Sequence, residues 1–298
     1  MDPRVREALE RERATIWGVC YRMTGSASAA DDLTQDTLVR ALERPPADLD
    51  APLRPWLVRV AVNLARDALR RRKREAYVGP WLPEPALTDA SIDEVERREI
   101  ASYALLVAME HLTPHQRAVL VLRDVLELGE AETAEALEST VGSVKVALHR
   151  ARKTIAEHAP AHTLSRETRV QNGVALAALL EALARGDVEA TRRLLAVDVR
   201  IVQDGAGRVR AALVPVVGIE KVLTFLFNLA KITPPPIETR WIELNHTPAL
   251  DARLPPRPPP IANRVVMWAE LDAEGGIAVL HNLVAPEKLE RLDARMGR

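Results

Sequence analysis

The chain has 298 residues, which is enough for two or three domains with separate hydrophobic cores. Its formal net charge of −1 gives no global basic character, so any nucleic-acid-binding surface must come from local charge. A single cysteine, Cys20, excludes an internal disulfide, and no apolar run approaches the ~20 residues that span a bilayer. The N-terminus is charged from Asp2 to Arg13, unlike a signal peptide. We therefore expect a soluble cytoplasmic protein without membrane contact.

Residues 4–44 are predicted to form two helices separated by Gly25 and Ser26. The core face of the second helix is expected to carry Leu33, Leu38 and Leu42, which recur at helical spacing. Polar and acidic residues gather at its start: Asp31, Asp32, Gln35 and Asp36. Acids at that place suit the positive end of the helix dipole. They equally suit docking of a basic partner, and the residues alone leave both interpretations open.

Residues 56–74 are predicted to form a third helix with seven basic residues and one acid. One stripe of this helix, which starts at Trp56, carries polar and basic residues at helical spacing: Arg59, Asn63, Arg66 and Arg70. A basic run is most often a solvated helix end. A basic face beside an aromatic side chain is also what binding of melted DNA uses, because cations track the phosphates and a ring supports an unstacked base.

Residues 77–97 are predicted to be a linker, because the proline-rich segment Trp81–Pro85 cannot be helical. From about residue 92 to residue 158 the pattern is helical. Glu130–Glu157 predicts a helix, a tight turn and a second helix that begins near Thr140, whose side chain suits an N-cap. One face of that second helix is apolar: Val141, Val144, Leu148, Ala151 and Ile155.

The remaining positions of this second helix are largely polar or basic, and include Ser143, Lys145, His149, Arg150 and Lys153. Between Thr140 and Lys153 there are four fixed positive charges and no acid. A polar N-terminus with a basic flank is what a recognition helix needs to enter a major groove and to hold the flanking phosphates. An ordinary solvated amphipathic helix is the alternative, since helix-turn-helix patterns also occur by chance.

The chain changes character near Pro160. Helices are predicted over residues 170–185, 187–196 and 218–231, and extended segments over residues 199–203, 237–245, 264–271 and 277–283. Residues 204–207 form a predicted turn, and residues 254–260, with five prolines, a predicted surface loop. Helices followed by a curved antiparallel sheet indicate an α+β domain with a concave face.

Three of these segments, in the same order, resemble the extracytoplasmic-function (ECF) sigma factors of bacterial RNA polymerase over roughly residues 5–158. Residues 31–41 look like the polymerase-docking helix of that family. Residues 55–67, with the following arginine run, resemble its helix for the minus-ten promoter element. Residues 141–145 with residues 148–152 are similar to its minus-thirty-five recognition helix.

The resemblance implies residue roles. Polymerase contacts are expected at Asp31, Asp32, Gln35 and Asp36. DNA contacts are expected in two groups, the first around the minus-ten element and the second around the minus-thirty-five element: Arg54, Trp56, Arg59, Asn63, Arg66, Arg70 and Arg71, then Ser143, Lys145, His149, Arg150 and Lys153.

The C-terminal half resembles a subgroup of these sigma factors with a fused SnoaL-like (cystatin/NTF2-like) domain, which is taken to regulate the sigma core. Three short motifs carry this resemblance and are the expected regulatory contacts: Trp81, Leu82, Pro83, Glu84 and Pro85; Asp204, Gly205, Gly207 and Arg208; and Asn245 and Pro248. The chain departs from the subgroup at Ala206 and Arg208, where Gly and Lys are typical, and in its proline-rich insertion.

We therefore expect a multidomain protein with two all-α domains and a C-terminal α+β SnoaL-like domain. Its expected divisions are 1–76 (sigma region 2), 77–97 (linker), 98–160 (sigma region 4, helix-turn-helix) and 165–298 (SnoaL-like). The expected function is that of an ECF-type sigma factor, a monomer when free, that binds core RNA polymerase and promoter DNA and is regulated by its own C-terminal domain. The alternative is a one-component helix-turn-helix regulator with a ligand-sensing domain.

Catalysis is not expected. Asp204, His246 and His281 are the candidates for an acid–base pair in the C-terminal domain, but sequence shows neither their proximity nor a tuned pKa. No cofactor or metal is expected, because the seven histidines are scattered and Cys20 has no partner.

Overall fold

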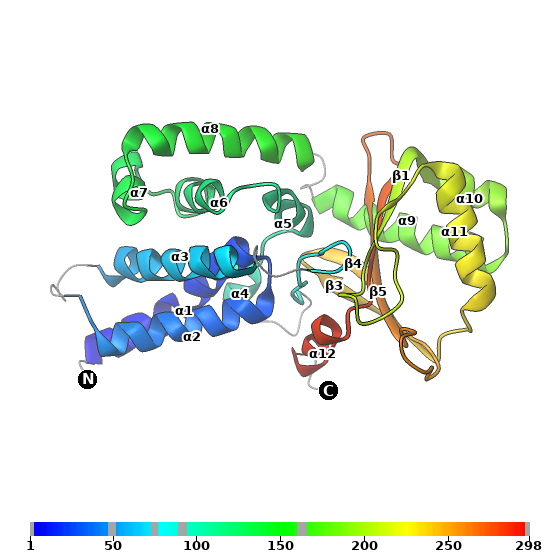
Figure 1. The fold of residues 1–298 in the computed structure, drawn as a ribbon, viewed down its shortest axis with the longest axis horizontal. Coiled ribbons are helices and arrows are strands. Elements are labelled where there is room, and N and C mark those ends of the chain that lie inside the picture. Colours follow the sequence, from blue (N-terminus) through cyan, green and yellow to red (C-terminus); the bar gives the residue numbers. More distant parts are fainter. Residues whose placement is uncertain (1–2, 47–51, 73–76, 89–93, 160–165, 296–298) are drawn as a thin grey trace. The chain divides into compact units, whose positions relative to one another are not determined.

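The computed structural model describes residues 3–46, 52–72, 77–88, 94–159 and 166–295 (Figure 1). Over these residues the chain forms two compact units. The N-terminal unit includes Pro83–Ala86, whereas Tyr77–Leu82 and Leu87 belong to the C-terminal unit. The expected linker is thus divided between the units. The expected domain limits at residues 76, 160 and 165, and the end of the arginine run at Lys73 and Arg74, lie outside the described residues.

The N-terminal unit begins with three helices: α1 (Pro3–Thr24), α2 (Ala27–Glu43) and α3 (Leu53–Arg72). Gly25 separates α1 from α2 with φ 63°, a conformation that glycine adopts without steric cost. Ser26 then caps α2 by accepting a hydrogen bond from the Ala29 amide at 3.2 Å. Leu33 is buried as expected, but Leu42 is 46% exposed, so its predicted place in the core was wrong.

The rest of the unit consists of short helices and one long one: α4 (Glu94–Glu99), α5 (Tyr103–Met109), α6 (Pro114–Leu120), the π-helical turn η1 (Val121–Val125), α7 (Glu130–Ala136) and α8 (Val141–His158). Thr113 and Gln116 form a capping box at the start of α6. Thr140 caps α8 by accepting from the Ser143 amide at 3.2 Å, as predicted. Between α7 and α8, Glu138 takes a φ of 51° in the tight turn.

One continuous hydrophobic core joins all the long helices of this unit. Val19, Val62, Val119 and Val144, from α1, α3, α6 and α8, are each fully buried in it. Cys20 is buried in the same core, and this burial raises the pKa of its thiol to about 12. The two expected helical domains therefore share their apolar interior.

Among its described residues, the C-terminal unit forms these helices and strands: α9 (Arg166–Ala184), α10 (Val188–Leu194), β1 (Leu195–Asp204), β2 (Val216–Val217), α11 (Ile219–Ile232), β3 (Glu238–Leu244), β4 (Thr247–Arg253), β5 (Arg264–Leu271), β6 (Ile277–Leu283) and α12 (Pro286–Arg295). The strands form one sheet in the order β2-β1-β6-β5-β4-β3. The β1–β6 pair is parallel, and the other pairs are antiparallel. Strand β4 and helix α12 were not predicted.

Helices α9 and α11 cover one face of this sheet (Figure 1). Leu176 of α9 and Val222 of α11 are fully buried against sheet residues such as Ile201 and Ala269. The strand register places Trp268 opposite His281, one position away from Ala269, so both rings belong to the other face of the sheet. The sheet therefore has an apolar face under the helices and a face that carries buried polar groups.

Candidate polymerase and nucleic-acid interfaces

Helix α8 exposes the predicted polar and basic residues and buries most of its predicted apolar face. Val144, Ala147, Leu148 and Ala151 are buried. All the expected DNA contacts on this helix are exposed: Ser143, Lys145, His149, Arg150 and Lys153. The prediction of the apolar face was wrong for Val141, which lies at the start of the helix and is 38% exposed.

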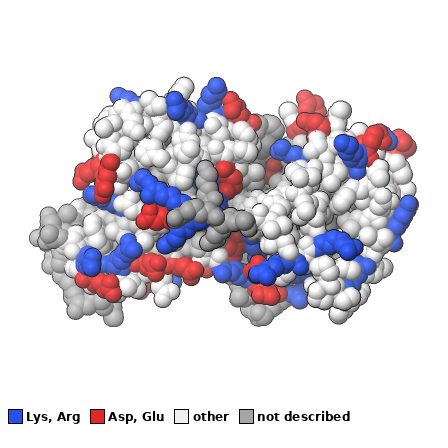
Figure 2. All heavy atoms as spheres, viewed as in Figure 1, with Lys and Arg blue, Asp and Glu red and all other residues white. Residues whose placement is uncertain are grey.

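Two basic side chains of α8 are held by acids of neighbouring elements. Lys145 lies 3.2 Å from the Glu130 carboxylate of α7. Arg152 makes two hydrogen bonds to Asp124, at 2.7 and 3.0 Å. Figure 2 shows basic side chains along the edge where α8 runs and acidic side chains around α7. Within the helix-turn-helix, α8 is therefore basic and α7 is acidic, although the chain as a whole is nearly neutral.

The expected polymerase contacts lie on the outer face of α2. Asp31, Asp32, Gln35 and Asp36 are all exposed. Asp31 also accepts a hydrogen bond from the Trp17 indole at 2.7 Å, which fixes its side chain against α1. The outer face continues with two apolar side chains, Val39 at 43% and Leu42 at 46% exposure. Because α2 begins at Ala27, its first turn carries no acid, so the predicted position of these acids at the helix start was wrong. The acids follow in the next turns, and the two exposed apolar side chains lie further along the same helix.

The basic face of α3 is only partly open to solvent. Trp56, Arg59, Asn63 and Arg66 are half-buried, whereas Arg54, Arg70 and Arg71 are exposed. Arg59 lies 3.3 Å from the Glu138 carboxylate and 3.9 Å from that of Glu135, both in the helix-turn-helix. Burial, then the Arg70 charge, lowers the pKa of Arg66, and Glu138 opposes this. Acids of α7 and its turn thus occupy part of the predicted minus-ten face.

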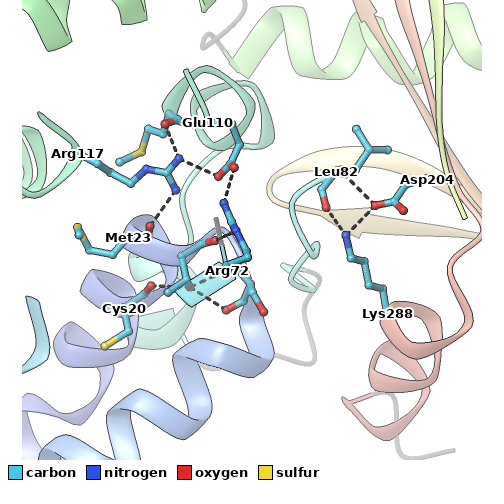
Figure 3. Close-up of polar contacts among 11 residues, drawn as sticks. Cys20, Met23, Arg72, Leu82, Glu110, Arg117, Asp204 and Lys288 are labelled. Carbon is cyan, nitrogen blue, oxygen red and sulfur yellow. Dashed lines mark hydrogen bonds and ion pairs between the residues drawn. The ribbon is translucent and has the colours of Figure 1, made fainter. Parts of the chain in front are cut away.

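A partly buried ionic network that the sequence did not predict fastens α1 and α3 to the start of the second helical domain (Figure 3). The guanidinium of Arg117 donates to the Met23 carbonyl at 2.8 Å and lies 2.8 Å from the Glu110 carboxylate. Arg72 donates to the other oxygen of Glu110 and to the Thr24 carbonyl, each at 2.6 Å. The cations satisfy carbonyls at the end of α1, where the helix dipole favours positive charge.

Within the N-terminal unit, Glu84 of the proline-rich segment is held at the start of α2. One of its carboxylate oxygens accepts from the Ser26 hydroxyl at 2.7 Å and from the Ser28 hydroxyl at 2.7 Å and amide at 3.2 Å. The Glu84 carbonyl accepts from Tyr21, and the Pro83 carbonyl accepts from Tyr103, both at 3.0 Å. Glu84 therefore acts as a second N-cap for the helix that carries the expected polymerase contacts.

Within the C-terminal unit, Asp204 gathers the preceding linker residues (Figure 3). Its fully buried carboxylate accepts from the Tyr77 hydroxyl at 2.5 Å, the Leu82 amide at 2.9 Å and the Lys288 ammonium at 2.7 Å. Lys288 of α12 also donates to the Leu82 carbonyl at 2.6 Å and lies 4.5 Å from the centre of the Trp81 ring. Burial, and then the hydrogen bond to Asp204, raises the pKa of Tyr77.

Most of the other expected regulatory residues lie in turns of the C-terminal unit or pack beside them. Gly207 has a φ of 68°, and a Cβ there would meet Val78 at 2.8 Å. Arg208 makes an exposed ion pair with Glu287 of α12 at 3.0 Å. Asn245 forms the β3–β4 turn with a φ of 51°, and Pro248 of β4 packs directly on Gly173 of α9. The last two expected regulatory residues are Gly205 and Pro85. Gly205 lies beside Val209, and Pro85 is buried.

The three catalytic candidates have separate partners. Asp204 is saturated by the donors described above. The His246 amide donates to the Thr88 hydroxyl at 2.8 Å in the β3–β4 turn. His281 is buried on the sheet, stacked on Trp268 with ring centres 5.1 Å apart and 3.2 Å from Glu270. The arrangement thus gives each of the three a packing or turn-forming role.

Among the described residues, no three His, Cys, Asp or Glu side chains gather in a way that would hold a metal ion. In the same part of the chain, no helix combines the length and apolar character needed to cross a membrane.

The chain is similar in sequence to known proteins over both of its helical domains and over most of its length. Residues 8–75 match Sigma-70 region 2, and residues 102–155 match Sigma-70, region 4. The ECF RNA polymerase sigma factor SigJ of Mycobacterium tuberculosis is 33% identical over 228 residues, covering 74% of this chain and 72% of SigJ. The probable ECF RNA polymerase sigma factor SigI of the same species is 28% identical over 311 residues, covering 99% of this chain and 98% of SigI.

The crystal structure of M. tuberculosis SigJ is similar, with a TM-score of 0.75 and 26% identity, covering 94% of this chain and 96% of that chain. The expected fold class, two helical sigma domains followed by an α+β domain, is confirmed by these matches together with the observed sheet. The match of residues 8–75 is not explained by the alternative of a one-component regulator.

Proposed function

Because this chain belongs to the ECF RNA polymerase sigma factors, we propose that α2, α3 and α8 divide promoter recognition among them. The family acts in transcription and is not a family of enzymes: the protein binds core RNA polymerase and directs initiation at specific promoters. The observation that supports this division is that the polar faces of the three helices, exposed on α2 and α8 and half-buried on α3, lie within the two matched sigma regions.

Helix α2 is the proposed polymerase contact. Its exposed carboxylates complement a basic partner, and the exposed Val39 and Leu42 add apolar area to the same face. The double variant Asp32→Ala/Gln35→Ala should bind core polymerase more weakly while keeping its fold, since both side chains are exposed. The control is Asp187→Ala, at an exposed helix-capping acid of the C-terminal unit outside the proposed face, and it should leave polymerase affinity unchanged. Unchanged polymerase affinity in the double variant would remove the docking assignment.

Helices α3 and α8 are the proposed DNA contacts. Arg59, Asn63 and Arg66, with Trp56, would meet the melted minus-ten strand, with Arg54, Arg70 and Arg71 on phosphates. The exposed face of α8, around Arg150, would enter the major groove at the minus-thirty-five element. Reversing the charge of Arg150 should weaken promoter use by the polymerase complex. An unaffected promoter would count against the recognition-helix assignment.

The C-terminal unit is the proposed regulator. Support comes from two adjacent pieces of the same short segment: Trp81 and Leu82 are held by Asp204 and Lys288, whereas Glu84 caps α2. The short stretch from Leu82 to Glu84 thus connects residues held by the C-terminal unit with the residue that caps the proposed polymerase-docking helix. We further propose that the free protein is a cytoplasmic monomer, which light scattering and cell fractionation test.

Run-off transcription with purified core polymerase tests both parts of the proposal. The template is a promoter selected by the full-length protein from a random library, and the variant is a truncation after His158. Specific initiation by the full-length protein supports the sigma assignment, and a changed yield with the truncated protein supports regulation. Equal yields from both proteins would eliminate the regulatory role, and no initiation by either would eliminate the sigma role of this chain.

A further inference from the structure

Helix α8 carries an apolar side chain at the centre of its outermost stripe. Val144, Leu148 and Ala151 define the buried side of the helix. Residues at 100° per position place Gly142, Val146, His149 and Lys153 on the opposite side. Val146 is 53% exposed there, among exposed polar and basic neighbours.

Beside Val146 the surface is hollowed. A groove of about 410 Å³ lies between the start of α6 and the first turns of α8, lined by Thr113, His115, Gln116, Gly142, Ser143, Val146, Ala147 and Arg150. Gly142 contributes to its openness, because a Cβ there would have only the Thr140 hydroxyl, at 4.0 Å, within reach. Val146 and Ala147 form an apolar wall, and Arg150 brings a cation to the rim.

The chemistry of the neighbours restricts what this apolar wall contacts. A partner that also meets Arg150, His149 and Lys153 is anionic, as duplex DNA is. In a major groove the bases present hydrogen-bonding atoms and one apolar feature, the C5-methyl group of thymine. A valine side chain without donors or acceptors gains nothing from the hydrogen-bonding atoms, whereas it gains apolar contact from the methyl group.

We propose that Val146 reads the methyl group of one thymine in the minus-thirty-five element and so determines specificity for thymine over cytosine at that position. This rests on the proposed role of α8 as the recognition helix. Val146 is a specificity residue beyond the polar and basic contacts, and Gly142, one turn earlier, leaves room for the base pair to approach it.

The test uses the full-length protein with core polymerase and a promoter that this complex selects. Each thymine of the minus-thirty-five element is replaced in turn by deoxyuridine, which lacks only the methyl group. At one position affinity should fall about fourfold, which corresponds to the ~0.8 kcal/mol of one buried methylene-sized group. Val146→Ala should reduce this discrimination, because the shorter side chain loses two methyl groups that contact the thymine methyl.

Two controls test whether the thymine preference comes from Val146 and from the methyl group. Val141→Ala, at a 38% exposed valine off the outer stripe, should keep the fourfold preference for thymine. In the wild type, 5-methylcytosine should bind better than cytosine at the same position. Both valines lie on a helix surface where alanine is a strong helix former, so loss of folding does not confuse the comparison.

If Arg150→Ala weakens promoter binding but no deoxyuridine substitution matters, α8 keeps its role and the inference about Val146 is overturned. If neither Arg150→Ala nor any deoxyuridine substitution matters, the proposed recognition helix itself fails. A loss of polymerase affinity in Val146→Ala without DNA would also overturn the inference, because the apolar contact would then belong to polymerase.

Discussion

Asp204 illustrates how a residue's role is decided by partners far away in the sequence. As part of a predicted turn it would make local hydrogen bonds, and it does accept one from the Ala206 amide at 3.1 Å. Its strongest partners, Tyr77, Leu82 and Lys288, come from distant parts of the chain. The aspartate itself could be singled out from its motif. Its ammonium partner could not, because Lys288 belongs to a helix that was not predicted.

Neutralising this buried pair should destabilise the C-terminal unit. Asp204→Asn leaves the Lys288 ammonium without its carboxylate, so we expect the free energy of unfolding to fall by about 3–5 kcal/mol. Chemical unfolding measures the effect. Glu287→Gln, which removes an ion pair that is exposed on both sides, is the control and should cost about 1 kcal/mol or less. Equal effects of the two substitutions would contradict the structural role of Asp204.

His115 should make the N-terminal unit less stable in acid. Burial, and then the Arg66 charge, lowers the pKa of His115 from its ordinary value of about 6.5. The unfolded chain therefore binds the proton more readily, so this contribution to stability is complete above about pH 6.5 and is lost as pH falls through the lower folded pKa. Between pH 7 and pH 5, unfolding of His115→Asn should depend less steeply on pH than unfolding of the wild type, and identical slopes would exclude this contribution.

At the level of helices and strands, the long periodic elements were predictable and the short ones were not. Helices α2, α3 and α8 follow from apolar spacing, although α3 begins at Leu53 because Pro55 is tolerated in a first turn. Strand β4 escaped prediction because Pro248 lies in it. That proline pairs with Glu243 of β3, before β4 begins to pair with β5, so its missing amide hydrogen costs the sheet little.

The contact between α3 and α7 has a functional consequence at the same scale. Glu135 and Glu138 compete with DNA phosphates for Arg59, so Glu135→Gln/Glu138→Gln should bind forked promoter DNA more tightly without polymerase, about two- to fivefold for exposed pairs. Fluorescence anisotropy at low salt measures the change. Glu181→Gln/Glu189→Gln changes the net charge equally in the C-terminal unit and is the control. An equal gain in both variants would assign the effect to net charge alone.

For the molecule as a whole, the division into two units with separate cores predicts two regions of independent stability. Arg117→Met removes the buried cation of the network and should lower the stability of the N-terminal unit, by less than the ~3–5 kcal/mol of a fully buried pair because Glu110 is partly exposed and keeps Arg72 as a partner. Asp204→Asn should act on the C-terminal unit only. Hydrogen exchange followed by mass spectrometry distinguishes them peptide by peptide, and faster exchange throughout the chain in either variant would show a single cooperative unit instead.

The sequence indicated the long helices and the change of character near Pro160, because hydrophobic periodicity is a local property. It did not indicate that the linker is divided between the units, or that the two helical domains share one core. Those features depend on pairs such as Glu84 with Ser28 and Arg117 with Met23, which lie 56 and 94 residues apart in the chain. Single-sequence patterns carry no information on such distant pairings.

The buried Cys20 gives this protein an experimental advantage. A thiol must ionise before it reacts with a maleimide, and burial with a pKa of about 12 keeps Cys20 protonated and covered in the folded state. Cysteines introduced at exposed positions, such as Glu10 on α1 and Glu189 on α10, would then be labelled selectively in the otherwise natural sequence. A donor and an acceptor dye at these two sites would report, molecule by molecule, how the distance between the units changes when core polymerase is added.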